Sequence, residues 1–115
     1  MNKLHPDHPR KIFIAHSIGM TDKAVEYAKT LGAFEVYVPG IDTIQTGTEK
    51  EILEANRRAL KDADECHVLW DLSSLGTIFD MGMAFGLGIP IYIVKTKTHH
   101  WTKFVVKREG KYLIE

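Results

Sequence analysis

Residues 63–90, ADECHVLWDLSSLGTIFDMGMAFGLGIP, decide the fold class. The apolar run at 66–70 is typical of a buried β-strand, and the pattern over 77–87 predicts a helix. The Gly-Ile-Pro sequence after that helix ends it, and the apolar run at 91–94 predicts another strand. A strand, a helix and a second strand in this order are typical of two parallel strands joined by a crossover helix.

The rest of the chain repeats this alternation. In chain order, we predict a strand at 12–15, a helix from 21 or 22 to about 31, a strand at 34–38, a loop at 39–48 and a helix that ends near 62. Thr48 and Glu51 have the spacing of a capping box at the start of that last helix. Apolar segments at 104–106 and 112–114 are candidates for one or two further strands. The order predicts an α/β fold, a parallel sheet with helices on both faces that binds ligands at the carboxyl ends of its strands.

The composition is that of one ordinary globular domain, residues 1–115, whose first ten residues we expect to be flexible. The charges cancel and 44% of the residues are hydrophobic, which excludes a disordered chain and a uniformly basic nucleic-acid binder. Cys66 is the only cysteine, so an internal disulfide and a zinc site of several thiolates are excluded. The polar N-terminus predicts a cytoplasmic protein. Asp80 and four glycines interrupt the apolar run 72–94, so we expect it to form a core rather than a membrane span.

The zero net charge hides an uneven distribution. Residues 1–11 carry +2, residues 12–94 carry −6 and residues 95–115 carry +4. The last segment also contains three aromatic residues that could bury surface. We therefore expect a homodimer or larger homo-oligomer in which this tail helps to cover a ligand pocket. The alternative is a monomer with a solvated, charged surface.

Asp80 is the only strongly acidic or basic residue between positions 72 and 94. We place it in the first turn of the helix at 77–87, where free N–H groups and the helix dipole would partly offset the cost of burying its charge. A first-turn acid on a solvated helix would have a purely structural role. This helix is apolar nearly all round, so we expect it to be buried and Asp80 to be functional.

Asn56 is a second polar residue in apolar company. It lies four residues after Ile52 and four before Leu60, so it should face the sheet with them. A satisfied core amide and a ligand contact at the cleft are both open interpretations.

Serine-containing loops follow the strands at 12–15 and 66–70. Ser17 follows the first of them, and the sequence 73–77, Ser-Ser-Leu-Gly-Thr, follows the second and precedes a helix. Hydroxyls and free N–H groups at a helix start can hold a phosphate, although simple turn chemistry would use the same residues. The chain has no P-loop and no GxGxxG motif, so neither an NTPase nor a dinucleotide enzyme is indicated.

The histidines do not have the spacing of a metal site, and we expect no metal. The sequence at 99–103, His-His-Trp-Thr-Lys, mixes basic and aromatic residues, but it is too short to make nucleic acid a favoured partner.

The stretch 63–90 resembles the nucleoside 2-deoxyribosyltransferase superfamily. The shared pattern is a strand, a loop that ends in glycine, and an acid followed by x-Gly-x-Ala; its residues are Gly76, Asp80, Gly82 and Ala84. Ser74-Leu75-Gly76 and Ser17-Ile18-Gly19 are similar to the phosphate loops of the 2'-deoxynucleoside 5'-phosphate N-hydrolases within that superfamily.

The resemblance implies a flavodoxin-like, doubly wound parallel sheet of four to five strands in three α/β/α layers, with strand order 2-1-3-4. It also implies an enzyme without a cofactor that cleaves or transfers at the N-glycosidic bond of a (deoxy)nucleoside or nucleoside 5'-monophosphate. Asp80 would attack C1' of the sugar. Asn56 would contact a sugar hydroxyl. The substrate contacts expected beside them are Phe13, His16, Ser17, Ser74, Gly76 and Thr77.

Three positions depart from the family's usual residues. The nucleophile is usually Glu, the second acid Asp and the first-strand residue Tyr; this chain has Asp80, Asn56 and Phe13. Since an amide does not donate and recover a proton, Asp71 becomes the candidate proton donor. The alternative function is a nucleotide-binding or sensing protein of the same fold that has lost turnover.

Overall fold

The computed structural model describes residues 10–32, 34–70 and 74–95. The β-strands in this part of the chain are β1 (Lys11–Ala15), β2 (Glu35–Tyr37), β3 (Glu65–Leu69) and β4 (Ile91–Lys95). The α-helices are α1 (Thr21–Lys29), α2 (Pro39–Asp42), α3 (Glu49–Lys61) and α4 (Leu75–Gly86), and a short 3-10 helix, η1 (Ile18–Met20), precedes α1. Residues 1–9 and the basic tail after Lys95 lie outside the described residues, and with them the candidate strands at 104–106 and 112–114.

The strands form one parallel sheet in the order β2-β1-β3-β4, which confirms the predicted fold class and strand order. Phe13 on β1 lies opposite Tyr37 on β2 and Cys66 on β3. The two inner strands are almost wholly buried after their first residues, as expected for strands covered on both faces. Burial raises the pKa of the Cys66 thiol far above its ordinary value, so this cysteine is unreactive.

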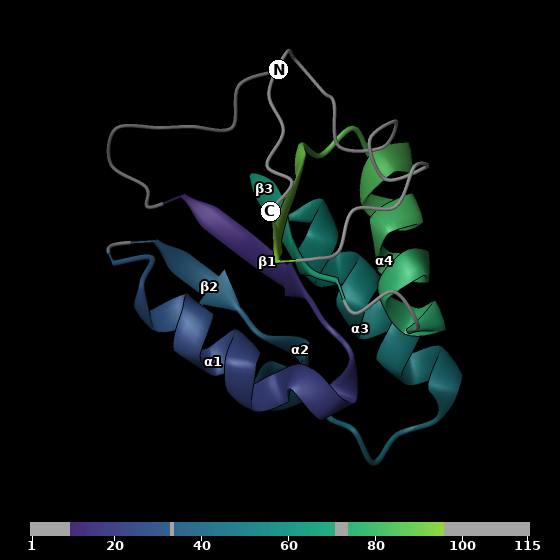
Figure 1. The fold of residues 1–115 in the computed structure, drawn as a ribbon. Coiled ribbons are helices and arrows are strands. Elements are labelled where there is room, and N and C mark those ends of the chain that lie inside the picture. Colours follow the sequence, from purple (N-terminus) through teal and green to yellow (C-terminus); the bar gives the residue numbers. More distant parts are fainter. Residues whose placement is uncertain (1–9, 33, 71–73, 96–115) are drawn as a thin grey trace.

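Helices cover both faces of the sheet (Figure 1). On one face, α3 and α4 pack over a cluster that includes Phe13, Leu60, Val68 and Met81. On the other face, α1 packs over a second cluster that includes Ile12 and Ile14 of β1. The carboxyl ends of β1 and β3 therefore lie next to the N-terminus of α4, where the sequence placed its candidate site residues.

Two local predictions need correction. The loop expected at 39–48 contains the short helix α2, which Pro39 begins and in which the Asp42 carboxylate accepts a 2.8 Å hydrogen bond from the Val38 N–H. Helix α4 begins at Leu75, before the predicted start at 77, because the Ser74 hydroxyl accepts a hydrogen bond from the Thr77 N–H. Asp80 is therefore in the second turn, beyond the free N–H groups that the sequence analysis assigned to it.

Helix α4 is also less buried than its sequence indicated. Thr77, Asp80, Met81 and Ala84 form its buried side, and the opposite side is exposed. The capping box that starts α3 is confirmed: Thr48 and Glu51 exchange two hydrogen bonds between side chain and backbone.

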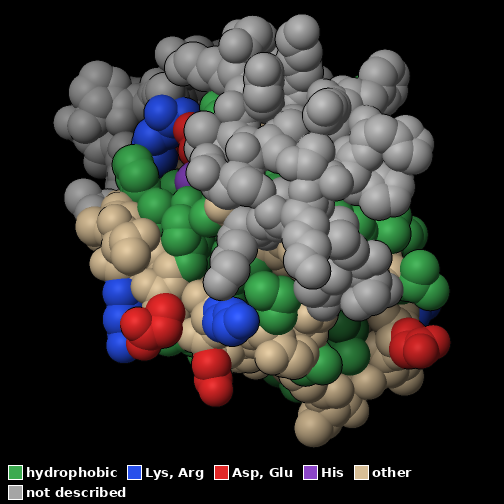
Figure 2. All heavy atoms as spheres, viewed as in Figure 1, with side chains coloured by type: hydrophobic (Ala, Val, Ile, Leu, Met, Phe, Trp, Pro, Cys, Tyr) green, Lys and Arg blue, Asp and Glu red, His purple; other side chains and the backbone are tan. Residues whose placement is uncertain are grey.

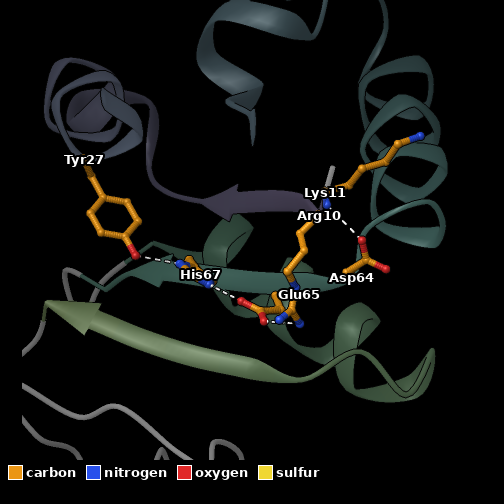
Figure 3. Close-up of polar contacts among 6 residues, drawn as sticks. All are labelled: Arg10, Lys11, Tyr27, Asp64, Glu65 and His67. Carbon is orange, nitrogen blue, oxygen red and sulfur yellow. Dashed lines mark hydrogen bonds and ion pairs between the residues drawn. The ribbon is translucent and has the colours of Figure 1, made fainter. Parts of the chain in front are cut away.

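A polar network joins β3 to α1 and to the start of β1 (Figure 3). His67 Nδ1 lies 2.6 Å from the Tyr27 hydroxyl, and its Nε2 lies 2.8 Å from a Glu65 oxygen that belongs to a carboxylate also paired with Arg10. Beside it, the Asp64 carboxylate accepts a hydrogen bond from the Lys11 N–H. These contacts satisfy polar groups on the α1 face of the sheet, where burial without partners would be costly. Within the described residues, no helix is long and apolar enough to cross a membrane.

Candidate functional site

A cavity of about 190 Å³ lies at the carboxyl ends of β1 and β3. Its walls come from the segment after β1, the start of α2, the first half of α3 and the N-terminal half of α4. Half of its lining consists of residues predicted from the sequence: His16, Ser17, Asn56, Ser74, Gly76 and Asp80. The other lining residues are Ile18, Pro39, Gly40, Gln45, Ile52 and Leu53.

A larger hollow of about 400 Å³ lies between α3 and the edge strand β2. Lys11 and Glu35, at the amino ends of their strands, line it, and Lys11 is already paired with Asp62 at 2.7 Å. In a parallel sheet ligands bind at the carboxyl ends of the strands, so the smaller cavity is the candidate site.

Asp80 enters the cavity from the buried side of α4. Only 6% of the residue is exposed, and within the described residues its carboxyl group has no hydrogen bond or ion pair. Burial raises the pKa of Asp80 from 3.8 to about 7, because an apolar environment disfavours the charged form. A carboxyl that ionises near neutral pH at the wall of a cavity is suited to nucleophilic or acid–base chemistry.

Asn56 lies on α3 with its amide oriented by its neighbours. Thr43 Oγ1 donates a 2.7 Å hydrogen bond to Asn56 Oδ1, and the Tyr37 hydroxyl lies 2.5 Å from the same Thr43 oxygen. Since Thr43 donates to Asn56, the Tyr37 hydroxyl donates to Thr43. Because Thr43 occupies Oδ1, the amide group that Asn56 has left for a ligand in the cavity that it lines is Nδ2, a hydrogen-bond donor.

His16 is held by backbone groups on both sides of its ring. Its Nδ1 donates to the Ser17 carbonyl at 2.7 Å, and its Nε2 accepts from the Gly40 N–H at 3.1 Å. Burial lowers the pKa of His16 below its ordinary value, which keeps the ring neutral and suits this pair of bonds. A Cβ on Gly40 would lie 2.8 Å from His16 Cε1, so only glycine allows α2 to approach so closely. His16 thus joins the segment after β1 to the start of α2.

The N-terminal end of α4 supplies Ser74 and Gly76 to the cavity. The Ser74 hydroxyl caps the helix, so its role is at least partly structural. Ser17 lies opposite, at the start of η1, and its side chain makes no capping hydrogen bond there. Thr77 is buried beneath this end, and its Oγ1 has no hydrogen-bond partner in the described part of the chain.

Among the described residues, two that the sequence predicted as substrate contacts, Phe13 and Thr77, do not line the cavity. Phe13 is fully buried and stacks on Tyr37, with ring centroids 5.6 Å apart, so it supports the site from within the core. Asp71 lies outside the described residues. The sequence analysis missed Thr43, Gly40 and Gln45, because it predicted a plain loop for their segment. The only local signal for a helix there was the spacing of Pro39 and Asp42, the first and last residues of α2.

The sequence profile of the nucleoside 2-deoxyribosyltransferase family matches residues 10–113. The chain belongs to this family. Its enzymes cleave or transfer at the N-glycosidic bond of nucleosides, which is the reaction class that the sequence resemblance predicted. Among curated proteins, none matches the sequence significantly.

Solved structures of similar fold include three enzymes. One is the 2-deoxyribosyltransferase of Bacillus psychrosaccharolyticus, with TM-score 0.67, 16% identity and coverage of 91% of this chain and 86% of that one. Another is the CMP N-glycosidase BcmB of Clostridium botulinum, with TM-score 0.67, 15% identity and coverage of 92% and 89%. A 2-deoxyribosyltransferase from Leishmania mexicana matches with TM-score 0.62, 23% identity and coverage of 79% and 67%. At these identities, the likeness shows that this chain and the three enzymes have the same fold.

Proposed function

We propose that this nucleoside 2-deoxyribosyltransferase family member cleaves, or transfers at, the N-glycosidic bond of a nucleoside 5'-monophosphate, with Asp80 as the nucleophile. The observation that carries the proposal is the position of the Asp80 carboxyl group, buried at the wall of a cavity that also contains Asn56 and two serines. A sugar ring needs such a mixture of a carboxylate, a hydrogen-bond donor and small hydroxyl groups.

In the first step, an oxygen of ionised Asp80 bonds to C1' of the sugar while the bond from C1' to the base nitrogen breaks. The bonding electrons leave with the base, which takes a proton from an acid; we assign that acid to Asp71. In the second step, the oxygen of water or the nitrogen of another base bonds to C1', and the Asp80 carboxylate is released. The proton of the incoming group returns to Asp71. Water would make the protein a hydrolase, and a second base would make it a transferase.

Asn56 supports this step as a donor to a sugar hydroxyl, since its Oδ1 is already used by Thr43. The fixed amide orientation would hold the sugar with C1' toward Asp80. His16 and Phe13 have supporting roles: His16, in the cavity wall, keeps the segment after β1 in place against α2, and Phe13, behind the wall, supports Tyr37.

The phosphate would lie between Ser17 and the N-terminus of α4, beside Ser74, Gly76 and Thr77. Backbone N–H groups in the first turn of a twelve-residue helix favour an anion there. A nucleotide substrate agrees with the Clostridium botulinum structural neighbour, which is a CMP N-glycosidase. We also propose a cytoplasmic homodimer or larger homo-oligomer whose basic tail, residues 95–115, helps to cover the pocket.

The test is to incubate the protein with a panel of ribo- and deoxyribonucleoside monophosphates and their nucleosides, and to measure free base by chromatography. We expect base release from at least one monophosphate, and none from an Asp80→Asn variant with an unchanged far-ultraviolet circular dichroism spectrum. Binding of nucleotides without base release would contradict the proposal and favour a sensor. Equal base release by Asp80→Asn would contradict the assignment of the nucleophile.

A further inference from the structure

Residues 38–45, which include α2, form a small folded unit that we call the α2 segment. The Thr43 N–H donates a 3.0 Å hydrogen bond to the Pro39 carbonyl. The Gln45 side chain donates to the Pro39 and Thr43 carbonyls at 2.9 and 3.1 Å. All these bonds lie within the α2 segment, so they give it a shape without attaching it to the rest of the molecule.

The α2 segment buries little apolar surface. Its buried apolar residues, Val38 and Pro39, lie at its start, whereas Ile41 is 63% exposed and Ile44 77%. Hydrophobic side chains are visible at the surface in the lower half of Figure 2, where Figure 1 places α1 and α2. A segment held by few buried contacts opens locally at a low cost in free energy, so its position depends on its polar attachments.

Side-chain hydrogen bonds near both ends attach the α2 segment to other elements. Towards its end, Thr43 donates to Asn56 of α3. Towards its start, the Gly40 N–H donates to His16 Nε2, which belongs to the segment after β1. Neither partner of the first bond titrates, whereas an imidazole gains a proton in mildly acidic solution. The attachment at Gly40 is therefore the one that a change of pH can break.

The neutral His16 ring carries its proton on Nδ1. This nitrogen lies 2.7 Å from the Ser17 carbonyl, which only accepts, so Nδ1 is the donor of that bond. The Met20 N–H donates to the same carbonyl and holds it in place. Nε2 then offers its lone pair to Gly40. A second proton on Nε2 would place two donors 3.1 Å apart, so the charged ring loses its bond to the α2 segment.

The surroundings of His16 give its charged form little support. Among the described residues that line the cavity, Asp80 is the only other titratable group. The pKa of Asp80 is about 7, so in the acidic range where His16 gains a proton this carboxyl is mostly neutral. The Asp42 carboxylate of α2 is bonded to the Val38 N–H instead. The groups that α1, α2 and α3 place around the ring or the cavity are uncharged: Thr21, Gly40, Gln45, Ile52, Leu53 and Asn56.

We propose that His16 is an acid-sensitive latch whose neutral ring holds the α2 segment in the cavity wall and whose protonation releases it. Pro39, Gly40 and Gln45 line the cavity, so release opens that wall. Burial lowers the pKa of His16 from 6.5 in the closed state, and the open state binds the proton more tightly. Opening therefore increases as pH falls below 6.5. The latch concerns the shape of the cavity and does not depend on the proposed reaction.

The first experiment measures amide hydrogen exchange of the full chain at pH 7.5 and pH 5, corrected for the intrinsic effect of pH on exchange. It uses the Asp80→Asn variant, which removes the titration of Asp80. We expect the protection of the α2 segment to fall at least about fivefold at pH 5, while α3 keeps its protection. Equal protection of the α2 segment at both pH values would overturn the proposal. An equal fall in α3 would indicate general acid unfolding and would overturn it too.

A matched pair of substitutions in the Asp80→Asn background tests which histidine is responsible. His16→Gln supplies an Oε1 acceptor to the Gly40 N–H and does not titrate, so the fall in protection at pH 5 should disappear. His67→Gln makes the same change at the other buried histidine of the described residues, which is bonded to Tyr27 and Glu65, and the fall should persist. Either variant giving the opposite result would overturn the assignment of the latch to His16.

The His16 ring supplies a measurement that needs no substitution in the latch. NMR of the ring nitrogens should show the proton on Nδ1 in the neutral form and a titration midpoint below 6.5. The fall in protection of the α2 segment should begin near pH 6.5 and level off near that midpoint. A neutral ring with its proton on Nε2, or a midpoint at or above 6.5, would overturn the proposal even if both glutamine variants failed to fold.

Discussion

Thr43 Oγ1 donates a hydrogen bond of 2.7 Å to Asn56 Oδ1 between two segments thirteen residues apart in sequence. Thr43 is 4% exposed and Asn56 8%, so water does not compete for this bond. The bond occupies Asn56 Oδ1, so the group that Asn56 has left for a ligand in the cavity is the donor Nδ2.

Thr43→Val should lower kcat/KM about tenfold by releasing the Asn56 amide from its orientation, the effect of about one hydrogen bond. It should also lower the free energy of unfolding by about 1–3 kcal/mol, because the Tyr37 hydroxyl and Asn56 Oδ1 lose a buried partner. Thr43→Ser keeps the hydroxyl and is the control. If the valine and serine variants had the same kcat/KM, the orientation of Asn56 would not matter for the reaction.

Asp80→Asn should stabilise the protein at alkaline pH. The pKa of Asp80 is raised from 3.8 to about 7 on folding, so the folded state binds the proton more tightly and loses stability as pH rises through that window. At about 1.36 kcal/mol for each pKa unit, removing the charge should add up to about 4 kcal/mol at pH 8. Urea unfolding should show the gain falling to less than half at pH 5. Glu26→Gln, at an exposed acid of α1, is the control; a gain for Asp80→Asn that did not change with pH would contradict this account.

The rate of base release should depend on the same ionisation. A nucleophilic carboxylate must be charged, so kcat/KM should rise about tenfold per pH unit up to the Asp80 pKa of about 7, and it should fall again where the acid that protonates the leaving base loses its proton. The measurement is kcat/KM from pH 5 to 8. Asn56→Asp should move the rise to higher pH, because a second carboxylate in the cavity disfavours the charged form of Asp80. A flat profile over this range would contradict Asp80 as the nucleophile.

Ser17→Ala should reduce the preference for monophosphates over nucleosides by about 1–2 kcal/mol, the range for a hydrogen bond to a charged group. Ser17 is the better test of the phosphate site because its side chain makes no capping hydrogen bond, whereas Ser74→Ala would also remove the cap of α4. Isothermal titration of Asp80→Asn, with and without Ser17→Ala, measures both affinities without turnover. Equal affinity for nucleotide and nucleoside before the Ser17 change would remove the case for a phosphate site.

The residue order was sufficient to predict the parallel sheet and the burial of Asn56. Both follow from periodicity within one element or from the alternation of strand and helix, which are local properties of the chain. The strand order was predicted from the family resemblance. The positions of Ser17, Ser74 and Asp80 at one edge of the sheet follow for the same reason, because all parallel strands present their carboxyl ends together.

Other features depended on contacts between distant segments. The apolar sequence of α4 indicated burial all round, yet one side of the helix is buried and the other is exposed. The short helix α2 brings Thr43 to Asn56 and Gly40 to His16, and neither contact has a signal in the sequence. The raised pKa of Asp80 likewise depends on how deeply the second turn of α4 is buried. Hydropathy says which residues avoid water, whereas the distance between two side chains is decided only when the elements that carry them have packed.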